Sequence, residues 1–142
     1  MESTILAPAA TLVLWSLVVL VWTAISRFQA FAKSGIDVNT APPGGRGANL
    51  EGVLPDSVMW KSHNYTHLME QPTLFYAIVA VLAIAGAGYG VNTALAWAYV
   101  VIRIVHSLWQ ATVNRIPVRF ALFGLSTLCL LGLTINALRA TL

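Results

Sequence analysis

Long apolar runs without charge, separated by shorter polar segments, dominate this chain. Residues 4–26, 71–102 and 120–138 contain no charged side chain. A helix needs roughly 20 apolar residues to cross the hydrocarbon core of a bilayer, so the first and last runs each supply one span. The middle run is too long for one span and is interrupted by GAGYGVN at 86–92, where glycines and asparagine favour a turn. The pattern therefore predicts four membrane-spanning helices.

These spans predict an all-α fold, an integral membrane four-helix bundle that forms one domain over residues 1–142. We expect helices over about 5–31, 57–86, 92–113 and 116–138. The first run lacks a basic leader and begins after Glu2, so we interpret it as a permanent helix and not as a signal peptide. The second helix is polar in its first half and apolar in its second, and Pro72 should kink it.

Composition and charge agree with a membrane protein and suggest its orientation. Hydrophobic residues make up 58% of the 142 residues and charged residues only 9%, against about 25% charged in soluble domains. Basic residues gather around the long loop at about 32–56, which is rich in Gly, Pro and Asn, and around the third loop, whereas the second loop has none. The positive-inside rule then places the first and third loops in the cytoplasm and both termini outside. The net charge of +3 reflects this topology and requires no nucleic-acid partner.

The third helix carries three polar residues on one face. Arg103, His106 and Gln110 follow at i, i+3 and i+7. Counted from the turn at Asn92, Arg103 lies roughly 16 Å deep, near the bilayer midplane, with His106 and Gln110 at roughly 21 and 27 Å. A charge at this depth costs a few kcal/mol even on the lenient insertion scales, so it should face the bundle interior and contact a partner.

The second helix predicts a matching polar stripe. His63, His67 and Glu70 follow at i, i+4 and i+7, and Glu70 lies at roughly 25 Å, level with His106. The two stripes would form a charged groove. One interpretation is structural, a bridge from Arg103 to Glu70 or to backbone. The other is an anion site fed from the cytoplasm.

The anion site would be formed by four basic side chains, two of which stand at the start of the fourth helix, where the helix dipole adds to them: Arg103, His106, Arg115 and Arg119. The two arginines could equally be an interfacial basic anchor. The histidines His63 and His67 could chelate zinc with Glu70, but no cysteine lies nearby and no HExxH motif is present, so we expect no metal site. The single cysteine, Cys129, excludes a CxxC site.

Two motifs resemble those of the MAPEG family, the membrane-associated proteins of eicosanoid and glutathione metabolism. HNYTHLMEQPTLFY at 63–76 is similar to the family's Asn-x-x-Glu-x-x-x-Pro segment. RIVHSLWQATVNRIPVRF at 103–120 follows the Arg-x-x-His and Arg-x-Pro-x-Arg pattern of the third and fourth helices. With four spans and a matching length, the likeness covers most of the chain and points to a bacterial-type member similar to microsomal glutathione transferases.

The resemblance implies a homotrimer that binds glutathione between subunits near the cytoplasmic face. Glu70 would take the glutathione amino group, His106 and Arg115 would lie along the tripeptide, and Arg27 would contact a carboxylate. Arg119 would hold the sulfur as thiolate, since a nearby guanidinium lowers the pKa of a thiol. The expected set is therefore Arg119 as the catalytic residue, with glutathione contacted by Glu70, His67, Arg103, His106, Gln110, Arg115 and Arg27.

Several residues depart from the family pattern. His67 stands where the family usually has Asn, Gln110 replaces a tyrosine, and Phe120 and Phe123 replace polar or tyrosine positions. Two functional hypotheses follow. The chain is either a glutathione transferase or peroxidase acting on apolar electrophiles or lipid hydroperoxides, or a non-catalytic lipid-binding or scaffolding member, such as a subunit of a larger membrane complex. We expect it to be a multi-pass protein of the bacterial inner membrane, in contact with lipids.

Overall fold

The computed structural model describes residues 4–142, and all regular structure in this part of the chain is helical. Glu2, which entered the argument against a signal peptide, lies outside the described residues. Four helical segments are long and apolar enough to cross a membrane, at Leu6–Ser34, Asp56–Ile84, Val91–Thr112 and Ile116–Thr141. The all-α, four-span prediction is confirmed, and the chain is an integral multi-pass membrane protein.

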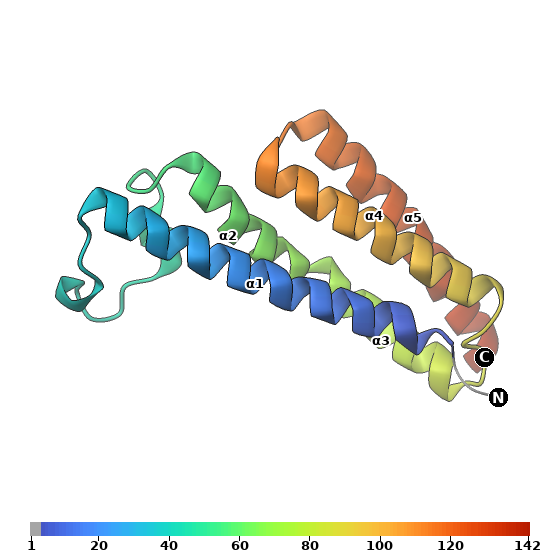
Figure 1. Ribbon diagram of the computed structural model, residues 1–142. Helices are drawn as coiled ribbons and strands as arrows, with labels where there is room; N and C mark the ends of the chain where they lie inside the picture. The colour runs from blue at the N-terminus through green and yellow to red at the C-terminus, as the bar shows by residue number, and fades with distance from the viewer. Residues whose placement is uncertain (1–3) are drawn as a thin grey trace.

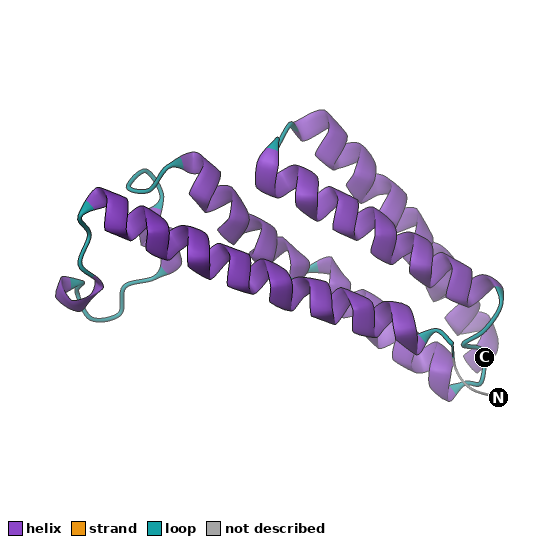
Figure 2. Cartoon of the chain, viewed as in Figure 1, coloured by secondary structure: helices purple, strands orange, loops and turns teal. Residues whose placement is uncertain are grey.

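The helices form an elongated bundle with its loops at two ends. Helix α1 (Leu6–Ser34) lies along α2 (Asp56–Leu68) and α3 (Gln71–Ile84), and α4 (Val91–Thr112) forms a hairpin with α5 (Ile116–Thr141). Figure 1 shows the start of α1, the C-terminus and the α3–α4 turn at one end, and the α1–α2 loop and the α4–α5 turn toward the other. Figure 2 shows that the α1–α2 loop is the longest irregular segment; it contains only two short 3₁₀ turns, Val38–Thr40 and Gly47–Leu50.

The second span is broken and not merely kinked. Helix α2 ends at Leu68, and α3 begins at Gln71, with Pro72 in its first turn. Proline has no N–H to donate to the preceding turn, and its ring clashes with the carbonyl four residues earlier. Glu70, between the two helices, has φ −87° and ψ −98°, outside the helical region. The break turns Glu70 away from the direction that a continuous helix would give it.

The core of the bundle is apolar and aromatic. Phe75 of α3 and Tyr99 of α4 are both fully buried, and their rings stack with centroids 4.4 Å apart. The other core residues come from all the long helices, including Leu12, Val19, Leu82 and Leu133. Large apolar side chains also cover the outside of the helices, for example Leu14 and Leu17 of α1 and Leu128 and Leu131 of α5. In a membrane-spanning bundle these outer faces are available to lipid or to a neighbouring subunit.

Candidate functional site

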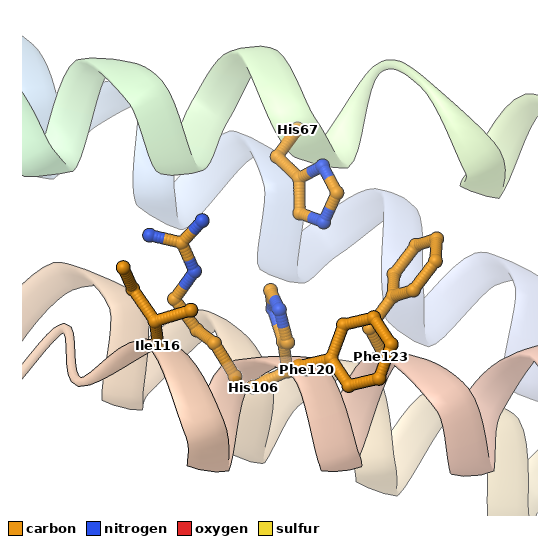
Figure 3. Close-up of a pocket in the computed structure, with 6 residues that line it drawn as sticks. His67, His106, Ile116, Phe120 and Phe123 are labelled. Atoms are coloured by element: carbon orange, nitrogen blue, oxygen red, sulfur yellow. The ribbon is translucent and has the colours of Figure 1, made fainter.

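A pocket lies where α2, α4 and α5 approach one another, near the end that carries the α4–α5 turn. It has a volume of about 190 Å³ and is lined by His67, His106, Ile116, Arg119, Phe120 and Phe123. In Figure 3 the ring of His67 points from its helix toward the ring of His106 on the opposite side of the pocket, with Phe120 and Phe123 beside them. The pocket therefore combines two imidazoles and one guanidinium with an apolar wall.

The two histidines are close and differ in their surroundings. Their ring centroids lie 5.1 Å apart, and the His67 ring lies 5.5 Å from that of Phe123. His106 is almost fully buried. His67 is half-buried, and its Nδ1 lies 2.8 Å from Oε2 of Glu70. The carboxylate of Glu70 thus contacts the pocket indirectly, through His67.

The turn between α4 and α5 positions Arg119. Asn114 closes α4 in the left-handed region, with φ 55°, a conformation that Asn tolerates better than most residues. Its side-chain Oδ1 accepts a 2.6 Å hydrogen bond from Nη1 of Arg119. Both ion pairs among residues 4–142 join a histidine to a glutamate, so no carboxylate there neutralises Arg119. The guanidinium is half-buried at the pocket wall and carries a full positive charge.

Arg103 lies behind the pocket and is fully buried. Its Nη2 donates a 3.3 Å hydrogen bond to the carbonyl of His67, and its guanidinium lies 5.8 Å from the ring centroid of Phe123. Nε and Nη1 have no hydrogen-bond partner in the described part of the chain. This geometry corresponds to the Arg103–backbone bridge that the sequence allowed, and not to a bridge with Glu70. Arg103 supports both His67 and Phe123, two walls of the pocket.

The sequence model of the MAPEG family matches residues 5–139. This chain belongs to the MAPEG family. Searches of curated proteins and of solved structures found no match. Family membership fits a role in membrane glutathione or eicosanoid metabolism, and the match spans all four membrane segments.

Only some of the expected site residues of this MAPEG protein come together within one chain. His67, His106 and Arg119 line the pocket, and Arg103 lies directly behind it. Gln110 is buried, with its Oε1 lacking a hydrogen-bond partner within residues 4–142. It is not among the residues that line the pocket.

The other three expected residues lie elsewhere. The side chain of Glu70 is 61% exposed, because the break in the second span turns it outward. Arg115 is exposed, and its carbonyl accepts a 3.3 Å hydrogen bond from Trp109. Arg27 donates a 2.8 Å hydrogen bond to Ser62 and lines a separate pocket under the α1–α2 loop. A ligand that touched all of them would need surfaces beyond this one pocket.

In the described structure His63, His67 and Glu70 do not come together as zinc ligands. His63 pairs with Glu51 of the α1–α2 loop, whereas His67 pairs with Glu70. Across residues 4–142, no group of three His, Cys, Asp or Glu side chains is placed to hold a metal ion. The polar stripe read from the spacing of the second helix is thus divided between two separate pairs.

Sequence reasoning missed the apolar part of the site. Phe120 and Phe123 entered only as departures from the family pattern, and Ile116 was not considered. These residues follow at i, i+4 and i+7, with Arg119 between them, so one face of α5 carries all four. This helical spacing, which is visible in the sequence, could have predicted an apolar wall beside Arg119. Asn114 had no such signal, because its role depends on a backbone conformation.

Proposed function

We propose that this MAPEG protein is a membrane-bound glutathione transferase or peroxidase that holds a thiol as thiolate beside Arg119. The thiolate would attack an apolar electrophile or a lipid hydroperoxide. The observation that supports this function best is the position of Arg119 in the pocket, half-buried and without a carboxylate partner among residues 4–142. A guanidinium in such surroundings stabilises a neighbouring thiolate, which is the nucleophilic form of a thiol.

The apolar wall of the pocket fits the second substrate. Phe120 is 77% exposed and Ile116 is 71% exposed, on the outer face of α5. Both residues also line the pocket, so it opens onto the outer apolar face of α5. An apolar electrophile dissolved in the bilayer would reach the thiolate from this side without crossing water.

The size of the pocket favours a site completed by a neighbouring subunit. Ligand sites commonly have volumes of about 300–1,000 Å³, whereas this pocket has about 190 Å³. A tripeptide would therefore need a second wall. The homotrimer implied by the family resemblance would provide one, and it would bring Glu70, Arg115 and Arg27 of adjacent copies to the same ligand.

The test is titration of the purified, detergent-solubilised protein with glutathione while the ultraviolet absorbance of the thiolate is recorded. We expect a saturable signal in the wild type and its loss in Arg119→Ala. The matched control is Arg139→Ala, which removes an exposed arginine near the other end of α5. An equal thiolate signal in Arg119→Ala would contradict this function. An equal loss in Arg139→Ala would point to a general effect of charge.

A second candidate function is non-catalytic lipid binding or scaffolding, and the exposed Phe120 and Ile116 favour it. An acyl chain could occupy the apolar side of the pocket, with its acidic headgroup on Arg119. This function predicts copurifying anionic lipid that is lost on Arg119→Ala, together with no thiolate signal. Extraction and mass spectrometry of bound lipid would separate the two functions.

A further inference from the structure

The hydrogen bond between His67 and Glu70 determines which nitrogen of the imidazole carries the proton. Nδ1 of His67 lies 2.8 Å from Oε2 of Glu70. An ionised carboxylate only accepts hydrogen bonds, so Nδ1 must be the donor. The neutral ring then carries its proton on Nδ1 and has a free lone pair on Nε2. A carboxylate that orients an imidazole in this way is the arrangement found where histidine acts as a base.

The other ring nitrogen is available to a ligand. Within residues 4–142, Nε2 of His67 makes no hydrogen bond to protein, and His67 lines the pocket with Arg119. Two further contacts hold the ring of His67 in place. Arg103 donates a hydrogen bond to the carbonyl of His67, and the ring of Phe123 packs against the imidazole. The ionisable groups around His67 are therefore Glu70, Arg103, His106 and Arg119.

We propose that His67, oriented by Glu70, is the general base that removes the proton from the thiol at this site. The inference rests on the proposed function and names a further residue for it. The glutamate is then a positioning residue of a Glu–His pair, in place of, or in addition to, a contact with the amino group of the tripeptide.

The proton held by His67 serves both reactions. The S–H bond breaks, its proton moves to Nε2 of His67, and sulfur keeps the electron pair beside the guanidinium of Arg119. With an apolar electrophile, the thiolate forms a C–S bond as the bond to the leaving group breaks, and the leaving group takes the proton from Nε2 of His67. With a hydroperoxide, the thiolate attacks the terminal oxygen, and the O–O bond breaks. The departing alkoxide takes the proton back from His67 and leaves as an alcohol. The sulfenic acid that remains is reduced by a second thiol, which gives a disulfide and water.

The resting state of the pair is tested by nitrogen NMR of the wild-type protein labelled at histidine. We expect one ring protonated at Nδ1 alone, and we expect Glu70→Gln to weaken that preference. His63→Gln removes the other His–Glu pair, which is exposed and lies outside the pocket, and it should leave the His67 signal unchanged. A His67 ring protonated on Nε2 in the wild type would overturn the inference, whatever the activity.

The proton transfer is tested by measuring thiolate absorbance and proton release together, in weak buffer with an indicator dye, after glutathione is mixed with the protein. In the wild type and in His63→Gln, we expect fewer protons released than thiolates formed, because His67 keeps the proton. In His67→Asn, each thiolate should release a proton, and kcat/KM should fall by about 10²-fold, the lower range for a general base.

These measurements test the role of His67 and the role of Arg119 separately. Equal proton release in the wild type and in His67→Asn, with thiolate present in both, would overturn the role of His67 and leave the role of Arg119 intact. No thiolate in the wild type would overturn the proposed function, and the role of His67 with it.

Discussion

Arg119 is bound to the turn that precedes its own helix, through a 2.6 Å hydrogen bond from its Nη1 to Oδ1 of Asn114. The turn therefore determines where the charge of the pocket lies. Because Asn114 has a positive φ, its backbone and side-chain contributions can be separated by mutation. Glycine keeps the backbone conformation and removes the acceptor, whereas alanine removes the acceptor and strains the backbone.

Asn114→Gly should leave the fold intact and lower the affinity for thiol several-fold, because Arg119 is no longer held at the pocket wall. Asn114→Ala should do the same and also cost about 1–2 kcal/mol of stability. Thermal unfolding in detergent and the thiolate titration measure the two effects. An Asn114→Gly protein with unchanged thiol affinity would show that Arg119 is positioned by other contacts.

Ser107 should be more important to stability than Ser126, although both are fully buried. Oγ of Ser107 accepts hydrogen bonds from Trp15 of α1, at 3.0 Å, and from Asn64 of α2, at 2.8 Å. Ser126 donates only to a carbonyl of its own helix. Ser107→Ala leaves the buried amide of Asn64 and the half-buried indole of Trp15 unpaired, which should cost about 1–3 kcal/mol, whereas Ser126→Ala should cost well under 1 kcal/mol.

Denaturant unfolding of the two serine variants in the same detergent measures this difference. Tryptophan fluorescence gives a second measurement, because Ser107→Ala removes the partner of the Trp15 indole. Equal stability of the two variants would mean that lipid, detergent or water replaces the lost acceptor.

Arg103 should tolerate an apolar replacement of similar size better than a small one. It has no carboxylate partner among residues 4–142 and a single hydrogen bond, to the carbonyl of His67. Arg103→Met removes a buried charge that is poorly compensated, so the stability should stay unchanged or rise by about 1–4 kcal/mol. Arg103→Ala leaves a cavity and should cost about 2–5 kcal/mol. Unfolding in detergent tests both, and a severe loss in Arg103→Met would show that the charge itself is required.

The basic residues predict the orientation in the membrane. In a Cys129→Ser background, Thr40→Cys places a thiol in the exposed α1–α2 loop, and Tyr89→Cys places one in the exposed α3–α4 turn. We expect a membrane-impermeant maleimide to label Tyr89→Cys from outside intact cells or spheroplasts, and Thr40→Cys only after the membrane is opened. The reverse pattern would invert the topology and place the pocket near the outer face.

The sequence predicted the spans well and the site only in part, for physical reasons. The spans depend on long apolar runs, which hydropathy detects directly. The direction of Glu70 depends on a break of two residues before Pro72, and the spacing rule that placed it beside His63 and His67 assumes a continuous helix. Pro72 indicated that the helix would be disturbed, but not that the carboxylate would turn outward and pair with His67.

The sequence likewise predicted the burial of Arg103 but not its hydrogen-bond partner. Arg103 was correctly expected to face the interior, because a charge at that depth cannot face lipid. Its partner could not be chosen between Glu70 and backbone, because both were within reach on a continuous helix. In the structure the carbonyl of His67, five residues before Pro72, accepts its hydrogen bond. Contacts between subunits leave no pattern in one chain that distinguishes them from contacts with lipid.

The interruption of the second span also affects how the chain enters the membrane. Helix α3 has 14 residues and is about 21 Å long, too short to cross a hydrocarbon core of about 30 Å by itself. The remainder must come from α2, which carries Asn64 and His67 on its way to the break. Nδ2 of Asn64 donates a 2.8 Å hydrogen bond to Oγ of Ser107 on α4. The polar half of the second span therefore obtains its buried hydrogen-bond acceptor only from α4, which is synthesised after it.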